Sequence, residues 1–186
     1  MKKLLLTALC VVCLGILCAA ADNDAKNSLK ATLHGLIEVP PVATQATGTF
    51  TGTISPDGSS ITYTLTYTNL STQVLFSHIH FGFPKENGGV VVFLCGPAAG
   101  APGGPPATFP SPPPCPDTTS GTVTGTITAA NVIGPTSQGI TPKVDFAKLI
   151  QAIREGAAYA NVHSSQSPGG EIRGFVHATD GDRDDK

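Results

Sequence analysis

Short runs of alternating apolar and polar residues fill most of the chain beyond residue 21. Their residues are mainly threonine, valine, glycine and isoleucine, which favour strands over helices. The tetrapeptide Ser55-Pro56-Asp57-Gly58 is typical of a hairpin turn, because proline presets one dihedral angle and glycine permits a positive one. Several short strands separated by turns predict an all-β sandwich or barrel. The predicted strands cover residues 48–55, 61–68, 74–81, 90–95, 121–128, 157–163 and 171–177.

One segment follows a helical spacing instead. Asp145 is a suitable N-cap, and Gly156 is a suitable stop at the other end. Amphipathic helices normally serve a core, so we expect one helix near residues 145–156 to pack its apolar face on the strands; an interaction helix is the alternative. The apolar positions that define this face are Phe146, Leu149, Ile150 and Ile153.

Residues 96–117 form a second exception. Nine of the sixteen prolines of the chain lie there, so this segment is predicted to be an extended loop and not part of a core. Cys95 and Cys115 flank it, and in an exported protein two such thiols predict a disulfide that closes the loop at its base. A two-cysteine metal site lacks the close spacing it would need, and a proline-rich recognition sequence remains the functional alternative.

Residues 1–21 have the parts of a secretory signal peptide. Lys2 and Lys3 precede a short apolar stretch, and small residues end it at Ala21. The stretch is shorter than the roughly 20 residues that a membrane span needs, so we expect export to the periplasm or the medium and no span after cleavage. A permanent N-terminal anchor is the alternative.

Residues 22–178 then form a single domain, and the acidic residues 179–186 are predicted to be a disordered tail. Loss of the two lysines changes the formal net charge from −2 to −4. With few aromatic residues and no basic excess, nucleic acid is not an expected partner.

The chain repeats itself. Residues 78–92 and 161–172 each contain a histidine that ends an apolar run, a polar loop with a proline, Gly-Gly and a further apolar run. Upstream, residues 48–55 are echoed by residues 121–128. The repeat predicts two halves built alike, with His80 and His163 in matching places.

These histidines are the strongest candidates for chemistry. His78 and His80 are two apart in a predicted strand, so their side chains leave the same face. If the halves pack together, His163 completes a three-histidine site suited to copper or zinc. Alternatively, each histidine braces a loop by bonding a backbone carbonyl or a carboxylate such as Glu171. His34 and His177 have no positional support as a fourth ligand.

Three charged residues are interpreted as structural loop anchors. Glu171 and Arg173 lie two apart in the strand after Gly169-Gly170, so their side chains share a face. They are expected to form an ion pair with each other or to contact loop backbone. Glu38 is interpreted as a third anchor. The sequence contains no evident nucleophile–base arrangement, phosphate loop or carboxylate dyad, so an enzyme is not expected.

Three motifs in this order resemble the CHRD domain, named for its repeats in chordin. They are Leu33-His-Gly-Leu-Ile-Glu-Val-Pro-Pro-Val42; His78-Ile-His80 with Asn87-Gly-Gly89; and Tyr159-Ala-Asn-Val-His163 with Pro168-Gly-Gly-Glu-Ile-Arg-Gly174. The resemblance runs from about residue 28 to about residue 177. It implies an all-β sandwich of immunoglobulin-like or Cu/Zn superoxide dismutase-like type.

The distant likeness to the dismutase touches the same residues, because its copper strand also reads His-X-His and a later Val-His supplies another ligand. By that analogy His78, His80 and His163 would bind copper. A bridging histidine, a zinc-site aspartate and the dismutase electrostatic loop have no counterpart here, which argues against superoxide dismutation.

Together these observations predict an exported, non-enzymatic binding protein that holds a copper or zinc ion at the three histidines. A structural or adhesive module of the cell exterior, in which the histidines only brace loops, is the alternative. A copper redox enzyme of the dismutase type ranks third. The sequence identifies no protein partner.

Overall fold

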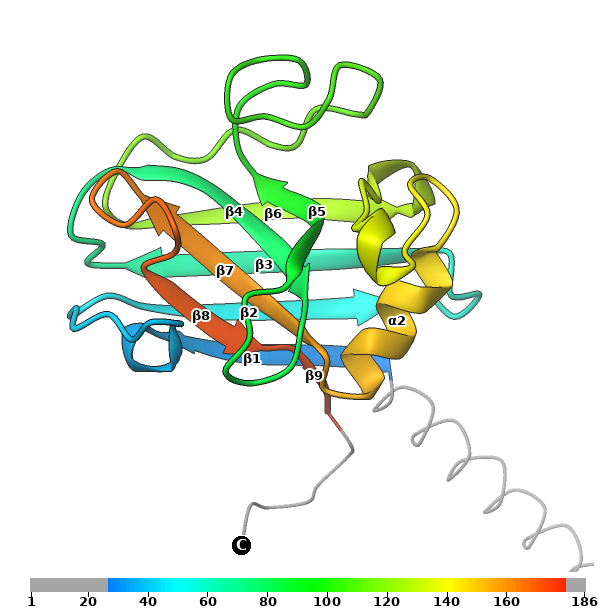
Figure 1. Cartoon of the computed structure of the whole chain (residues 1–186), viewed down its shortest axis with the longest axis horizontal. Helices are drawn as coiled ribbons and strands as arrows, with labels where there is room; N and C mark the ends of the chain where they lie inside the picture. The colour runs from blue at the N-terminus through cyan, green and yellow to red at the C-terminus, as the bar shows by residue number, and fades with distance from the viewer. Residues whose placement is uncertain (1–26, 180–186) are drawn as a thin grey trace, which may run out of the picture.

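The computed structural model describes residues 27–179. Within them the strands form one antiparallel sheet with the order β5-β4-β7-β8-β1-β2-β3-β6, and β9 pairs with β1 (Figure 1). The predicted all-β fold is confirmed. The strands are β1 (Ser28–His34), β2 (Thr47–Ile54), β3 (Ser60–Thr68), β4 (Val74–Phe81), β5 (Gly89–Cys95), β6 (Gly121–Thr128), β7 (Ala158–Ser164), β8 (Ile172–Phe175) and β9 (His177–Ala178).

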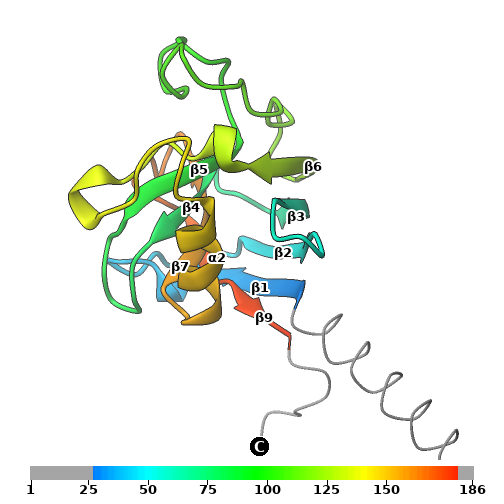
Figure 2. The ribbon, with the colours of Figure 1, turned by 90° about the vertical axis from the view of Figure 1, so that its right-hand side faces the viewer.

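The sheet folds back on itself into two layers. Strands β5, β4, β7 and β8 lie in front of β1, β2, β3 and β6 in Figure 1, and the turned view in Figure 2 shows the two groups side by side. The layers are joined where β8 pairs with β1, at His34 and Arg173. Alternating residues point between the layers and are fully buried, among them Leu33, Phe50, Leu65 and Ile79. Burial of this apolar core drives the fold.

The predicted strands agree with the observed ones to within about two residues, apart from the last. That segment is interrupted at Val176, so it forms β8 and β9. Strand β1 was missed, although its buried and exposed positions alternate as a strand requires.

The sequence echo corresponds to two hairpin-like units that meet along one line. Strand β4 pairs with β7, and each has its following strand on the outer side, β5 beside β4 and β8 beside β7. The upstream echo is also explained, because β2 and β6 flank the same strand, β3, in continuous register. The repeat therefore gives β5 and β8 equivalent places beside the β4–β7 pair, and it gives β2 and β6 equivalent places beside β3.

Helix α2 (Phe146–Arg154) is amphipathic and covers one end of the layers near β7 and β9. Its buried residues include all four predicted ones, and Gly156 follows it with a positive φ of 70°. Asp145 stands at the N-cap, but its side chain does not cap the helix. Its carboxylate accepts hydrogen bonds from Thr141 N and Lys148 Nζ instead, at 2.7 and 2.9 Å.

The proline-rich segment rises from the sheet as a loop, at the top of Figure 1. The predicted disulfide between Cys95 and Cys115 closes its base. Its glycines Gly96 and Gly103 pack against the side chain of Phe76 on β4. The loop therefore covers one ring that belongs to the sheet.

The predicted signal peptide lies outside the described residues, as does the acidic tail apart from Thr179. No helix within residues 27–179 has the length and apolar character that crossing a membrane requires.

Candidate metal centre

The pairing of β4 with β7 brings the three histidines to one face of the sheet. His78 lies opposite Asn161, His80 opposite Tyr159, and Phe76 opposite His163. Directly paired residues of antiparallel strands point to the same side, and so do residues two apart on one strand. His163 is thus a diagonal neighbour of His78, within the reach that cross-strand side chains have.

One nitrogen from each of the three rings lies within 4.8 Å of the others. His78 Nδ1 and His163 Nε2 lie 3.3 Å apart. Two nitrogens that bind one tetrahedral ion at about 2.0–2.1 Å lie about 3.3–3.4 Å apart. The pair therefore has the separation of two ligands to one ion, and without an ion it forms a long hydrogen bond from His78 Nδ1 to His163 Nε2.

The outward nitrogens of two rings are fixed by backbone carbonyls. His80 Nδ1 donates to Gly88 O at 2.9 Å, and His163 Nδ1 donates to Pro168 O at 3.0 Å. A carbonyl only accepts, so each neutral ring keeps its lone pair on Nε2. This arrangement, an outer N–H on a carbonyl and an unprotonated inner nitrogen, is typical of metal-binding histidines.

The inner side of the cluster is closed to water and poor in hydrogen-bond partners. The three histidines are 5, 9 and 5 % exposed, in chain order. The buried atoms His78 Nε2 and His80 Nε2 have no hydrogen-bond partner among the described residues. Buried polar atoms normally have a hydrogen-bond partner, and a metal ion bound at His80 Nε2 would supply the partner that this atom lacks.

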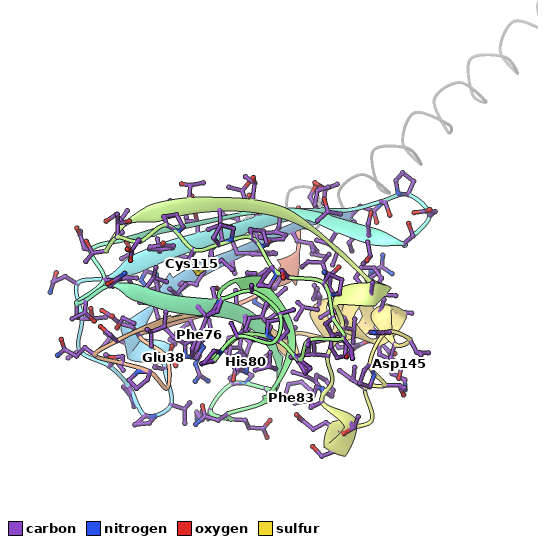
Figure 3. The ribbon with its side chains drawn as sticks, turned by 90° about the horizontal axis from the view of Figure 1, so that it is seen from above. Glu38, Phe76, His80, Phe83, Cys115 and Asp145 are labelled. Carbon is purple, nitrogen blue, oxygen red and sulfur yellow. A yellow bond between two sulfur atoms is a disulfide. The ribbon has the colours of Figure 1, made fainter. Side chains whose placement is uncertain are left out.

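Aromatic rings surround the cluster. Phe76 contacts the rings of His78 and His163 with centroid distances of 4.9 and 4.7 Å, and Phe93 stands perpendicular to His78 at 4.3 Å. Tyr159 stacks in parallel on His80 at 4.9 Å. Figure 3 labels Phe76 and His80, both of which belong to β4. These rings hold the imidazoles in place and exclude solvent.

The cluster is kept uncharged. Burial lowers the pKa of His78 to about 2, and the neighbouring His163 and His80 add to the effect. Burial also lowers the pKa values of His80 and His163 to about 4, although their carbonyl partners oppose it. All three side chains are therefore neutral imidazoles at neutral pH, the form that binds metals.

Arg173 is a loop anchor, but its ion-pair partner is Glu38, not Glu171. Its Nε donates to Glu38 Oε2 at 2.6 Å, and its terminal nitrogens donate to Glu86 O and Asn87 Oδ1 at 2.9 and 2.7 Å. Its guanidinium lies 4.4 Å from the centre of the Tyr159 ring. Burial raises the pKa of the Glu38 carboxyl, and the Arg173 charge opposes this shift.

Arg173 thereby holds the loop on which His80 depends. Glu86 and Asn87 directly precede Gly88, whose carbonyl accepts from His80 and whose N–H donates to the Tyr159 hydroxyl at 3.1 Å. A Cβ on Gly88 would overlap the Phe81 carbonyl, so the residue must be glycine. The Asn-Gly-Gly motif is explained by this close approach.

Glu171 anchors a different loop. Its Oε1 accepts from the Ser71 N–H and hydroxyl and from the Thr44 hydroxyl, at 2.7 to 2.8 Å. Burial alone would raise its pKa, but hydrogen bonds, including one from Ser164, outweigh burial and lower it. Glu171 bonds Ser71 and Thr44, and the predicted histidine–Glu171 bond is replaced by bonds from His80 and His163 to backbone carbonyls.

Two residues near the site escaped sequence reasoning. Tyr159 stacks on His80, and Asn161 donates to Glu38 Oε1 at 2.6 Å. Asn161 matches His78 in the repeat, and that substitution was the available signal. His34 and His177 are exposed and lie outside the cluster.

The fold and the site define an all-β domain with a disulfide-closed loop and a buried histidine cluster between two repeated hairpins. The family model for the CHRD domain matches residues 29–176. The chain therefore belongs to the CHRD domain family. A search of curated proteins found no match.

Proposed function

We propose that this chain is an exported, non-enzymatic binding protein that holds one copper or zinc ion through His78, His80 and His163. The observation that carries the proposal is that one nitrogen from each of the three rings lies within 4.8 Å of the others, while the Nδ1 atoms of His80 and His163 are bound by backbone carbonyls. Three imidazoles suit either metal and leave a further coordination position open.

The expected ligand atoms follow from the hydrogen bonds. His80 Nε2 and His163 Nε2 are the unprotonated nitrogens of rings whose Nδ1 atoms donate to Gly88 and Pro168. His78 Nδ1 faces His163 Nε2. A bound ion would sit among these atoms, and Phe76, Phe93 and Tyr159 would separate it from solvent.

Export is supported by three observations of different kinds. CHRD domains are generally extracellular, and the Cys95–Cys115 disulfide suits an oxidising compartment. The apolar start of the chain is consistent with a signal peptide.

A structural or adhesive module is the second candidate. The bonds from His80 and His163 to Gly88 and Pro168 brace the two glycine-rich loops, as this alternative requires. Loop bracing uses the outer nitrogens only, however, and it leaves His80 Nε2 without a partner and His163 Nε2 facing His78 Nδ1 at 3.3 Å.

The test is elemental analysis with copper and zinc titration of the purified, signal-free protein. We expect one ion per chain for the wild type and none for the double variant His80→Ala, His163→Ala. The double variant His34→Ala, His177→Ala is the matched control and should bind as the wild type does. Equal stoichiometry in wild type and site variant would overturn the metal site. A superoxide assay of the copper-loaded protein then separates a carrier from a dismutase.

A further inference from the structure

The charged groups around the three histidines indicate which metal ion the site favours, an inference that rests on the proposed function. Within residues 27–179, the metal-ligating group at this place consists of three histidines and includes no carboxylate or thiolate. Three neutral imidazoles bring no negative charge to a bound ion. Whatever charge the ion carries must therefore be stabilised by dipoles and rings alone.

The nearby carboxylates do not belong to the three-histidine group. Glu38 is bound by Arg173 and Asn161, both at 2.6 Å. Glu171 Oε1 is bound by Ser71 and Thr44, and its buried Oε2 has no hydrogen-bond partner among the described residues. A cation is stacked against the site instead. The Arg173 guanidinium lies on the Tyr159 ring, and the Tyr159 ring lies on His80.

Burial makes this lack of negative charge costly for a dication. The cluster is 5 to 9 % exposed and walled by aromatic rings. The cost of desolvating an ion grows with the square of its charge, so a divalent ion loses about four times as much solvation as a monovalent ion of equal size. Ordinary structural and catalytic zinc sites offset this cost with thiolates, carboxylates or water.

The hydrogen bonds of the outer histidine nitrogens also disfavour a divalent ion. The N–H groups of His80 and His163 are bound by neutral carbonyls, not by carboxylates. Carboxylate partners make an imidazole a stronger donor to a dication, and this site lacks them. The site therefore offers three nitrogen donors and little negative potential to a bound ion.

We propose that the centre selects the cuprous ion, Cu(I), over Zn(II) and Cu(II). A monocation carries half the charge into the buried site, and Cu(I) accepts three donors without water or an anion to complete its coordination. The site would thus hold copper in its reduced state and shield it behind Phe76, Phe93 and Tyr159.

The experiment is a set of competition titrations with the wild-type, signal-free protein. Cu(I) is supplied anaerobically against the chromophoric chelator bicinchoninate, while Zn(II) and Cu(II) are supplied against chelators of known affinity. We expect the dissociation constant for Cu(I) to be at least about tenfold lower than for either dication. Equal or tighter binding of Zn(II) or Cu(II) overturns the selectivity and leaves the metal site intact. Absence of binding by all three ions overturns the proposed function as well.

A paired substitution tests the electrostatic cause. Phe76 lies beside His78 and His163, so Phe76→Asp would place a carboxylate on the same face, and Phe76→Leu removes the ring without adding charge. We expect Phe76→Asp to shift the preference toward the dications by at least about tenfold relative to Phe76→Leu. Equal ratios in the two variants would contradict the electrostatic argument, and the wild-type titrations remain decisive if either variant fails to fold.

Discussion

Removal of the Arg173 side chain should strongly destabilise the fold, because it breaks a buried ion pair. The side chain is 2 % exposed, and its ion pair with Glu38 at 2.6 Å accompanies two further hydrogen bonds to Glu86 and Asn87. Arg173→Met leaves the Glu38 carboxylate buried without its cation. Loss of one partner of a buried pair costs about 3–5 kcal/mol. For a domain of this size that corresponds to a fall in Tm of roughly 6–20 °C.

Urea unfolding followed by circular dichroism at pH 7 measures the effect. The matched control is Lys148→Met, which breaks the exposed pair with Asp145 and should leave the unfolding midpoint almost unchanged. The double variant Glu38→Leu, Arg173→Met should recover part of the loss, because no lone charge is then buried. A loss below about 1 kcal/mol for Arg173→Met would refute the role assigned to this pair.

Three smaller perturbations test other parts of the structure. Gly88→Ala should cost about 1–3 kcal/mol in urea unfolding, because its Cβ overlaps the Phe81 carbonyl; an unchanged midpoint would contradict this. Cys95→Ser with Cys115→Ser should cost about 3 kcal/mol by the same assay and speed hydrogen exchange near Phe76; unchanged exchange would show that the loop does not cover this ring. The pKa values of the three histidines are lowered in the folded protein, so below pH 6.5 the unfolded chain binds more protons than the folded one. The metal-free protein should therefore keep its full stability above pH 6.5. Below that pH it should lose up to about 1.4 kcal/mol per histidine per pH unit. Unfolding curves at pH 7, 6 and 5 with equal midpoints would contradict this sign.

Local patterns were sufficient to predict most of the strands. Strand composition and turn residues place β4 and β6 at their observed bounds; β6 buries alternate residues, whereas residues 77–80 of β4 are all buried. Strand β1 shows the same alternation in Leu29, Ala31 and Leu33 and could have been found. The pairing order could not be predicted, since it depends on contacts between segments far apart in the sequence, such as β1 with β8.

The candidate site was predictable as a set of residues but not as an arrangement. The His-X-His spacing and the repeat nominated the three histidines, because spacing determines which side chains share a face. The partner of Arg173 was not predictable, since Glu38 lies 135 residues away and meets it only through β8 and the loop after β1. The stacking of Tyr159 on His80 likewise requires the β4–β7 register.

The three-histidine centre is tested most directly by X-ray absorption at the copper edge of the loaded, signal-free protein. The account predicts about three imidazole nitrogens at about 2.0 Å, with the outer-shell scattering that imidazole rings produce. His163→Asn should reduce the number of imidazoles to about two. A spectrum without imidazole scattering, or one that the His163 substitution leaves unchanged, would contradict the assignment of His78, His80 and His163 as a metal site.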